Sequence, residues 1–389
     1  MEVVNSVRKT IWFNIGFFAV TTVLGVIGWP LYAWHHGVSG AELALFVFYV
    51  WATGLGITVG YHRLFAHTTY KANPVIRFLL LFFGAAAFEQ TALDWASQHR
   101  DHHRYVDTDM DPYSIKKGFF YAHIGWLIFW KHKIHYENAL DLQKDPMVMH
   151  QHKNYLLWCA GAGIVTPVLI GACFGHALGA FLLAVCLRIT FVYHSTFCIN
   201  SVCHMFGKST YDVNATAKDH WLVALVTFGE GYHNFHHKFP VDYRNGIRWF
   251  DFDPSKWLIR GMAFLGLVHE LKRTSKFRIL EARLAGEKAS TSHLLQGFAM
   301  QPFVAKPLEQ LQAQYVLVRQ RLEGWEDAVR NYRVLVKEQM AAHSEEIKLA
   351  AGQKIREAHE HFQQAYGQWR ELISLPPLQL QLSLSAIPA

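Results

Sequence analysis

The fold is decided by the stretch AELALFVFYVWATGLGITVGYHRLFAH at residues 41–67. Its part up to Tyr61 is almost wholly apolar and is as long as the roughly 20 residues that a helix needs to cross a membrane. Two histidines, His62 and His67, follow directly in an HxxxxH spacing. An apolar span that ends in paired imidazoles predicts a membrane protein with candidate metal ligands at one membrane face.

Three more runs have the length and composition of membrane spans, at residues 11–34, 155–174 and 177–199. The first two of the four spans are joined by a few residues, and so are the last two, which predicts two helical hairpins. Two shorter apolar stretches, at 78–88 and 119–130, fit interfacial or re-entrant segments better than spans. We therefore expect an all-α integral membrane protein with four transmembrane helices.

The basic residues indicate how the spans are oriented. Neither hairpin turn holds Lys or Arg, whereas the region between the hairpins is rich in both. By the positive-inside rule this region, both termini and everything after residue 200 are cytoplasmic. The histidine-bearing segments would then form a helical cap on the cytoplasmic face. The basic residues between the hairpins are Arg63, Lys71, Arg77, Arg100, Arg104, Lys116, Lys117, Lys131, Lys133, Lys144 and Lys153.

Composition excludes several classes of protein. Of 389 residues, 51% are hydrophobic, which is too apolar for an ordinary soluble protein and favours several membrane spans. The net charge of +7 suits a face resting on anionic lipid, and the basic residues form no cluster on a soluble domain, so we expect no nucleic-acid partner. The five cysteines lie in or beside apolar runs without a CxxC pattern, which argues against a disulfide framework.

The histidines carry the chemistry. His99, His102 and His103 form an HxxHH, and His233, His236 and His237 form a second one; on a helix, residues three and four apart lie on one face. Neutral imidazole is a ligand for iron, zinc and copper. The predicted topology brings all three clusters to one side of the membrane, together with His204 and Asn200. We therefore expect the eight histidines, with His204 as a ninth ligand, to hold two metal ions.

These motifs resemble the membrane fatty acyl desaturases of the stearoyl-CoA desaturase type. The likeness rests on HRLFAH at 62–67, HRDHH at 99–103, NSVCH at 200–204 and GEGYHNFHHKFPVDYR at 229–244. It runs from about residue 11 to residue 257. The resemblance implies removal of two hydrogens from a saturated acyl chain, commonly at the ninth and tenth carbons, with O2 and two external electrons.

The resemblance also implies a ligand set and a substrate channel. Asn200 would bind iron through water; Trp95 and Thr196 would line a bent acyl channel; Asn14 and Lys131 are candidate head-group contacts. No side chain is implied as a catalytic acid or base, although Asp94, Asp101 and Glu230 could orient the ligands. The implied ligands of a non-haem di-iron centre are His62, His67, His99, His102, His103, His204, His233, His236 and His237.

Three positions depart from the family pattern. Ser97 and Gln98 replace an Arg-Asp pair before the second box, Glu89 replaces a glutamine, and Trp130 with Lys131 replaces an Arg-Lys pair. The loss of cations weakens a CoA phosphate site. The third box and its flanks favour acyl-CoA as the substrate, and an acyl chain of a membrane lipid is the alternative.

Electrons must come from outside, because the sequence holds neither a dinucleotide-binding fingerprint nor a fused haem-binding HPGG motif. A ferredoxin, rubredoxin or cytochrome with its reductase is implied as donor. Two rival functions stay open: a membrane di-iron hydroxylase, and a metal-binding or metal-transport membrane protein. We expect a bacterial inner membrane as the location.

The last third of the chain differs from the rest. We predict a membrane domain at 1–260 and a cytoplasmic helical tail at 261–389, because charged, Gln- and Ala-rich helix formers take over. Apolar residues recur there every three or four positions, from Leu308 to Val336 and again from Ile347 to Leu372. An α-hairpin, a stripe docked on the catalytic part and a coiled coil for oligomerisation all fit this pattern.

Overall fold

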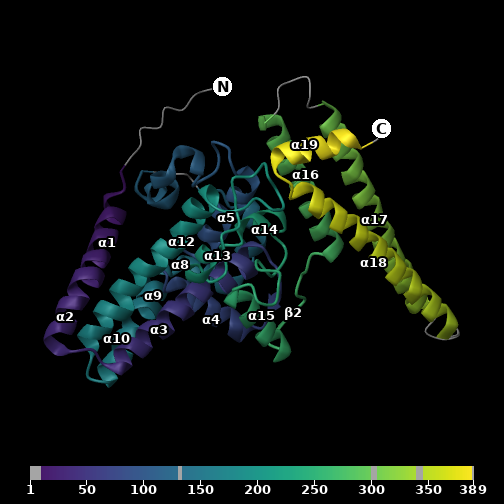
Figure 1. The fold of residues 1–389 in the computed structure, drawn as a ribbon. Coiled ribbons are helices and arrows are strands. Elements are labelled where there is room, and N and C mark those ends of the chain that lie inside the picture. Colours follow the sequence, from purple (N-terminus) through teal and green to yellow (C-terminus); the bar gives the residue numbers. More distant parts are fainter. Residues whose placement is uncertain (1–9, 130–133, 299–304, 339–344, 388–389) are drawn as a thin grey trace. The chain divides into compact units, whose positions relative to one another are not determined.

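A computed structural model describes residues 10–129, 134–298, 305–338 and 345–387 (Figure 1). The chain divides into two compact units: residues 1–209 with 215–273, and residues 210–214 with 274–389. The first unit holds all the apolar spans and the histidine boxes. The second holds the long helices of the tail.

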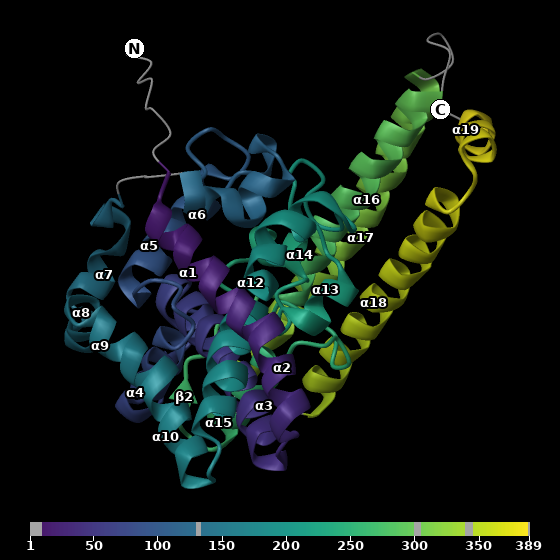
Figure 2. The same cartoon turned by 90° about the vertical axis from the view of Figure 1, so that its left-hand side faces the viewer.

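Four helices of the first unit are long and apolar enough to cross a membrane. The protein is therefore an all-α membrane protein, as predicted. The helices run over Trp12–His36, Gly40–Ala66, Tyr155–Cys173 and Ala177–Met205. Figure 2 shows the first of them, α1 (Trp12–Val23), η1 (Leu24–Gly28) and α2 (Trp29–His36), passing across the near side of this unit. The other three comprise α3 (Gly40–Leu55) with η2 (Gly56–Ala66), α9 (Tyr155–Ala160) with η6 (Gly161–Val165) and α10 (Thr166–Cys173), and α11 (Ala177–Ala180) with η7 (Phe181–Leu187) and α12 (Arg188–Met205).

Short turns join the helices into two hairpins. Gly37 and Gly175 have φ of 75° and 78°, which only glycine adopts without strain, and they follow α2 and α10. Ser39 and Glu42 then form a capping box that starts α3. The spans end later than the sequence predicts: the second continues from residue 61 to Ala66 and the fourth from residue 199 to Met205. His204 therefore lies on the last turn of α12 and not beyond it.

Much of the second span is wound as a π-helix. In η2 the backbone bonds from residue i to i+5, and the amide of His67 donates to the carbonyl of His62 at 3.0 Å. Two residues five apart are thus brought onto the same side of the helix. The HxxxxH spacing of the first box matches this winding.

A buried arginine ties the spans together at membrane depth. The guanidinium of Arg188 donates to Thr53 Oγ1 at 3.1 Å, to the carbonyl of Ala86 at 2.6 Å and to that of Gly163 at 3.0 Å. A charged group inside a membrane needs such internal acceptors, because lipid offers none. Arg188 thereby fixes α12 against α3, the segment after α4 and η6.

Short elements connect the spans and carry the second and third histidine boxes. The apolar helix α4 (Pro74–Ala85) is shorter than the spans, and the described part of the stretch after residue 119 holds the short elements η4 (Tyr121–Gly125) and α6 (Trp126–Phe129). A two-residue antiparallel pair, β1 (Lys71–Ala72) with β2 (Val268–His269), joins the end of the second span to the end of the unit. The other elements are α5 (Ala92–Tyr105), η3 (Ile115–Lys117), η5 (Tyr136–Ala139), α7 (Leu140–Gln143), α8 (Pro146–Lys153), α13 (Trp221–Val226), α14 (His233–Lys238) and α15 (Pro254–Phe264).

The second unit is a helical assembly with its own core. It comprises α16 (Lys276–Phe298), α17 (Ala305–Glu338), α18 (Glu345–Ile373) and α19 (Pro377–Ala386). The apolar repeats of α17 and α18 face each other, so that Leu322, Trp325, Phe362 and Trp369 are buried in one cluster. This contact within one chain fits an α-hairpin, and docking on the catalytic part and oligomerisation stay predictions.

Candidate metal centre

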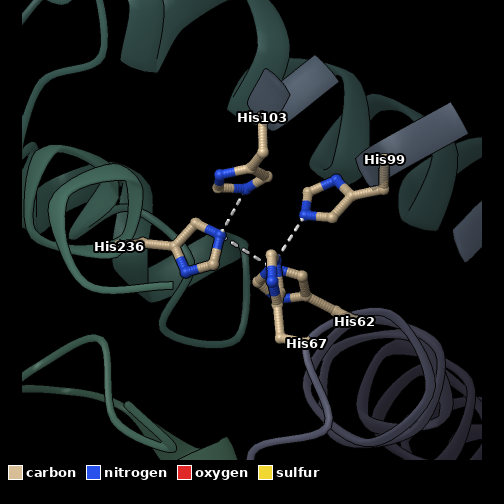
Figure 3. A group of neighbouring side chains, drawn as sticks. All are labelled: His62, His67, His99, His103 and His236. Atoms are coloured by element: carbon tan, nitrogen blue, oxygen red, sulfur yellow. Dashed lines mark hydrogen bonds between the residues drawn. The ribbon is translucent and has the colours of Figure 1, made fainter. Parts of the chain in front are cut away.

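Nine histidines meet in two groups, at the ends of the second and fourth spans and on shorter elements. The ligand-capable atoms of each group lie within 4.8 Å of one another. Figure 3 shows the first group, with rings contributed by η2, the residue after it, α5 and α14. Among the described histidines outside the three boxes, only His204 joins a group. The groups are His62, His67, His99, His103 and His236, and His102, His204, His233 and His237.

The rings point their Nε2 atoms at one another. In the first group the Nε2 atoms of His62 and His236 are 2.9 Å apart, as are those of His67 and His99. In the second group the Nε2 atoms of His204 and His233 are 3.0 Å apart. Two nitrogens at right angles on one ion, each about 2.1 Å from it, would lie roughly 3.0 Å apart. The spacing of the rings therefore fits metal ligation.

Each HxxHH box contributes to both groups. His99 and His103 belong to the first group and His102 to the second, whereas in the third box His236 belongs to the first and His237 to the second. On an α-helix of 3.6 residues per turn, the positions i+3 and i+4 lie about 100° apart around the axis. One box can thus serve two ions, which the expectation of a single shared face did not include.

Partners at Nδ1 fix the orientation of three rings. His62 Nδ1 lies 2.9 Å from Glu230 Oε2, and His102 Nδ1 lies 2.9 Å from Asp111 Oδ1. An ionised carboxylate only accepts, so these Nδ1 atoms donate and leave Nε2 with a free lone pair. His102 Nε2 aims this lone pair at the second group. Such an arrangement is typical of histidines that bind metal.

His204 is fixed by a longer relay. Its Nδ1 lies 2.7 Å from Thr216 Oγ1, and that hydroxyl donates to Asp107 Oδ1 at 2.6 Å. Because the hydroxyl hydrogen goes to Asp107, the His204 Nδ1 must donate to Thr216, which again leaves Nε2 bare. A ring that α12 supplies is thereby aligned by two loop residues.

Six of the box histidines have surroundings that favour the neutral imidazole. Burial lowers the pKa of six of these histidines well below the usual value, and repulsion from neighbouring imidazoles lowers it further. Neutral imidazole is the form that binds a metal ion. The six are His67, His99, His103, His233, His236 and His237.

Of the three carboxylates expected to orient ligands, only Glu230 contacts one. Asp94 accepts from the Tyr136 hydroxyl at 2.6 Å, and Asp101 accepts from the Asn138 amide at 2.8 Å. Their places near the second box are explained by capping and packing of α5. Asp111 and the Thr216 relay are not predicted from the sequence, because both lie in loops where no periodic pattern marks them.

An apolar cavity of about 350 Å³ opens onto both histidine groups. Its wall includes His62 and His99 from the first group and His233 from the second. The candidate channel residues Trp95 and Thr196 line the same cavity. The Trp95 ring stacks on His99, with centroids 4.7 Å apart.

The candidate water-linked ligand and one candidate head-group contact lie at the same cavity. Asn200 and Asn14 also line the cavity, and the Asn14 amide donates to the carbonyl of Leu127 at 2.7 Å. Lys131 and Trp130 lie outside the described residues. Where the family pattern has an Arg-Asp pair, the Ser97 hydroxyl donates to the carbonyl of His135 and Gln98 donates to Gln90.

Comparison with known proteins agrees with this geometry. The model of the fatty acid desaturase family matches residues 32–264, more than half of the chain. The chain belongs to the fatty acid desaturase family. The matched range contains every box histidine and His204, together with the cavity residues Trp95 and Thr196.

Three curated relatives are named as desaturases of acyl-CoA or of fatty acids. The chain is 44% identical to a probable acyl-CoA desaturase of Schizosaccharomyces pombe over 58% of its length, and 39% identical to acyl-CoA desaturase 1 of Saccharomyces cerevisiae over 68%. It is 37% identical to a Delta(9)-fatty-acid desaturase of Caenorhabditis elegans over 68%. The matched regions cover 48% and 53% of the two yeast proteins and 80% of the nematode protein. The chain thus spans about half the length of the first two.

Proposed function

We propose that this chain is an acyl-CoA desaturase that inserts a cis double bond, between the ninth and tenth carbons, into a saturated acyl chain. It uses O2 and two electrons at a di-iron centre. The observation that carries the proposal is the apolar cavity whose wall holds histidines of both groups, His62 and His99 from the first and His233 from the second. An acyl chain in this cavity lies beside both metal positions.

The nine histidines would hold two iron ions, with Asn200 contributing through a water molecule. Imidazole is a good ligand for iron, and the neutral rings with bare Nε2 atoms supply it. When bound, two iron ions and O2 provide the oxidant that an unactivated methylene requires. We assign no side chain as acid or base, because the hydrogens of a methylene are not acidic.

The protein's own residues select the carbon that reacts. Trp95 lines the cavity and stacks on His99, so it holds a chain in the cavity at a fixed distance from a ligand of the first group. Thr196 lines the cavity from α12. A saturated acyl chain has no functional group that marks the reacting carbon. That carbon can be selected only by fixing the position of the chain, and a rigid cavity wall does this. Asn14 and Lys131 would contact the head group.

The acyl carrier is proposed to be CoA, since the two yeast relatives are named acyl-CoA desaturases. Ser97 and Gln98 are neutral, so CoA phosphates would have to be bound by cations elsewhere. A membrane lipid is the competing carrier.

The remaining assignments rest on the sequence. An external ferredoxin, rubredoxin or cytochrome would supply electrons at the basic cytoplasmic face. The cap and both termini would be cytoplasmic, in a bacterial inner membrane. The tail could also mediate oligomerisation.

The test is lipid analysis by mass spectrometry in a host fed isotope-labelled stearate. The wild-type chain, with an electron donor, is expected to yield labelled cis-monounsaturated product. His236→Ala removes a ring of the first group and should abolish product. The matched control His361→Ala changes an exposed histidine of α18 and should leave the yield unchanged.

The other outcomes have definite meanings. Label that enters unsaturated CoA esters before phospholipids supports the CoA carrier, and the reverse order supports a lipid carrier. Hydroxylated product would replace the desaturase proposal with a hydroxylase. If no product forms although two metal ions are bound per chain, the desaturase proposal fails and metal binding or transport becomes the function.

A further inference from the structure

A carboxyl group lies in the wall of the apolar cavity. Glu89 follows α4 and lines the cavity beside Trp95 and Thr196. Its Oε1 accepts from the Thr196 hydroxyl at 2.8 Å, and its Oε2 accepts from the Trp95 indole at 3.3 Å. Both donors are neutral, so the charge of an ionised Glu89 has no counter-charge in these contacts.

The surroundings of Glu89 offer little to stabilise an anion. The groups that face it from η2, α9 and α12 are the phenols of Tyr61, Tyr155 and Tyr193. Asp94 on α5 accepts from Tyr136, and the guanidinium of Arg188 is directed at Thr53 and backbone carbonyls. The other titratable groups in the cavity wall are His62, His99, Tyr113, Cys159, Glu230 and His233.

The pKa of the Glu89 carboxyl therefore lies close to neutral pH. Burial raises the pKa of Glu89 to about 7, although the hydrogen bonds from Thr196 and Trp95 act to lower it. Part of its surface is open towards the cavity, where water can solvate the anion. An apolar chain that displaces this water removes the solvation and leaves the ionised form without compensation.

We propose that insertion of an acyl chain into this cavity is coupled to the uptake of one proton by Glu89, which makes Glu89 a determinant of acyl affinity. The inference rests on the proposed function in that it takes an acyl chain as the occupant. The free anion binds the proton from solvent when the chain enters and releases it when the product leaves. No bond other than the O–H bond is made or broken.

The coupling predicts the size and sign of a pH effect. A group that is half ionised near pH 7 in the free protein and neutral in the complex takes up about 0.5 proton on binding at pH 7 and about 0.9 at pH 8. The dissociation constant should then rise about tenfold between pH 6 and pH 8. Affinity is thus highest on the acid side, where Glu89 is already protonated.

The experiment titrates stearoyl-CoA into the metal-loaded protein in lipid nanodiscs, without reductant so that no turnover occurs. Calorimetry in buffers of different ionisation enthalpy gives the number of protons taken up. Glu89→Gln keeps the size and is always neutral, so its proton uptake should fall close to that of CoA alone. The matched control Glu137→Gln, with a side chain 83% exposed, should behave as wild type.

A second variant covers failure of Glu89→Gln to fold. Thr196→Val removes a donor that lowers the pKa of Glu89, so the pH dependence of proton uptake should shift to higher pH. Binding with the same proton uptake in wild type and Glu89→Gln, or no uptake by the wild type at pH 8, overturns the inference alone. No binding of stearoyl-CoA by any variant overturns the proposed function instead.

Discussion

At the residue scale, the rings of the candidate metal centre are held by partners distant in sequence. Glu230 holds His62, Asp111 holds His102, and the Thr216 relay holds His204. These contacts select the tautomer that leaves Nε2 free, so they act on metal affinity without touching the ion.

Asp111→Ala should therefore weaken metal binding. The change leaves the buried His102 Nδ1 without its acceptor, so the ring loses both its tautomer preference and its orientation. Loss of such a partner typically lowers metal affinity about 10- to 100-fold. The measurement is competition for iron with a chelator. Asp109→Ala, at an exposed neighbouring position, is the control and should match wild type. Equal iron affinities of wild type, Asp111→Ala and Asp109→Ala would show that Asp111 does not support metal binding.

Glu230 should also make the stability of the fold depend on acid pH. Burial would raise its pKa, but His62 and Arg63 lower it to about 2 from the usual 4.5. The stability that its ionised form gives is thus complete above about pH 4.5 and is lost as the pH falls towards 2. Glu230→Gln leaves Arg63 with one fewer buried partner and should cost roughly 3 kcal/mol near neutral pH.

The acid effect is read from unfolding temperatures between pH 7 and pH 3. The curves of wild type and Glu230→Gln should converge below pH 4.5, because only the wild type loses this contribution. The control Glu270→Gln breaks an exposed pair with Lys71 and should follow wild type throughout. Parallel curves for wild type and Glu230→Gln would show that the ionised carboxylate contributes nothing.

The sequence predicts the residues of the site only where spacing is local. HxxHH places its rings by helix geometry, so the box histidines could be named from the sequence. Asp111 and Thr216 could not, because they reach His102 and His204 only after loops have folded. Glu89 was visible as a departure from the family pattern, but its neutral surroundings depend on three separate helices.

At the scale of elements, apolar length alone does not predict where the helix of the second span ends. Its apolar run ends at Tyr61, yet the helix continues as η2 through His62 to Ala66. This π-helical segment packs against α4, where the two backbones meet closely. A Cβ at Gly56 would lie 2.6 Å from the amide nitrogen of Gly84.

Gly56→Ala should therefore displace η2 from α4. The atoms that a Cβ would meet belong to the backbone and cannot rotate away, so overpacking should cost about 1–3 kcal/mol or more. Because η2 carries His62, bound iron should fall as well. Gly16→Ala, in a span where nothing lies within 4 Å of the new Cβ, is the control. Unfolding temperature and iron content are measured together; wild-type values for both would contradict this account of η2.

At the scale of the whole molecule, the boxes gather at those ends of the second and fourth spans that lie away from the hairpin turns. The ends of the second and fourth spans carry His62 and His204, which belong to different histidine groups. Both spans must therefore end at the same level, and the two turns must lie on the other side. Apolar length and short connections were sufficient to predict this arrangement, because a helix in lipid has few alternatives.

The orientation of this arrangement in the membrane should follow the distribution of the basic residues. Lys and Arg are absent from both turns and frequent between the hairpins, so the turns should face away from the cytoplasm. Val38→Cys lies in the first turn and Asp109→Cys in the exposed loop after α5; each is made in a chain whose five cysteines are replaced by alanine. A membrane-impermeant maleimide should label Val38→Cys in intact cells and Asp109→Cys only after lysis. The reverse pattern would put the histidine boxes outside the cytoplasm, beyond the reach of a cytoplasmic electron donor, and labelling of both in intact cells would contradict the hairpin topology itself.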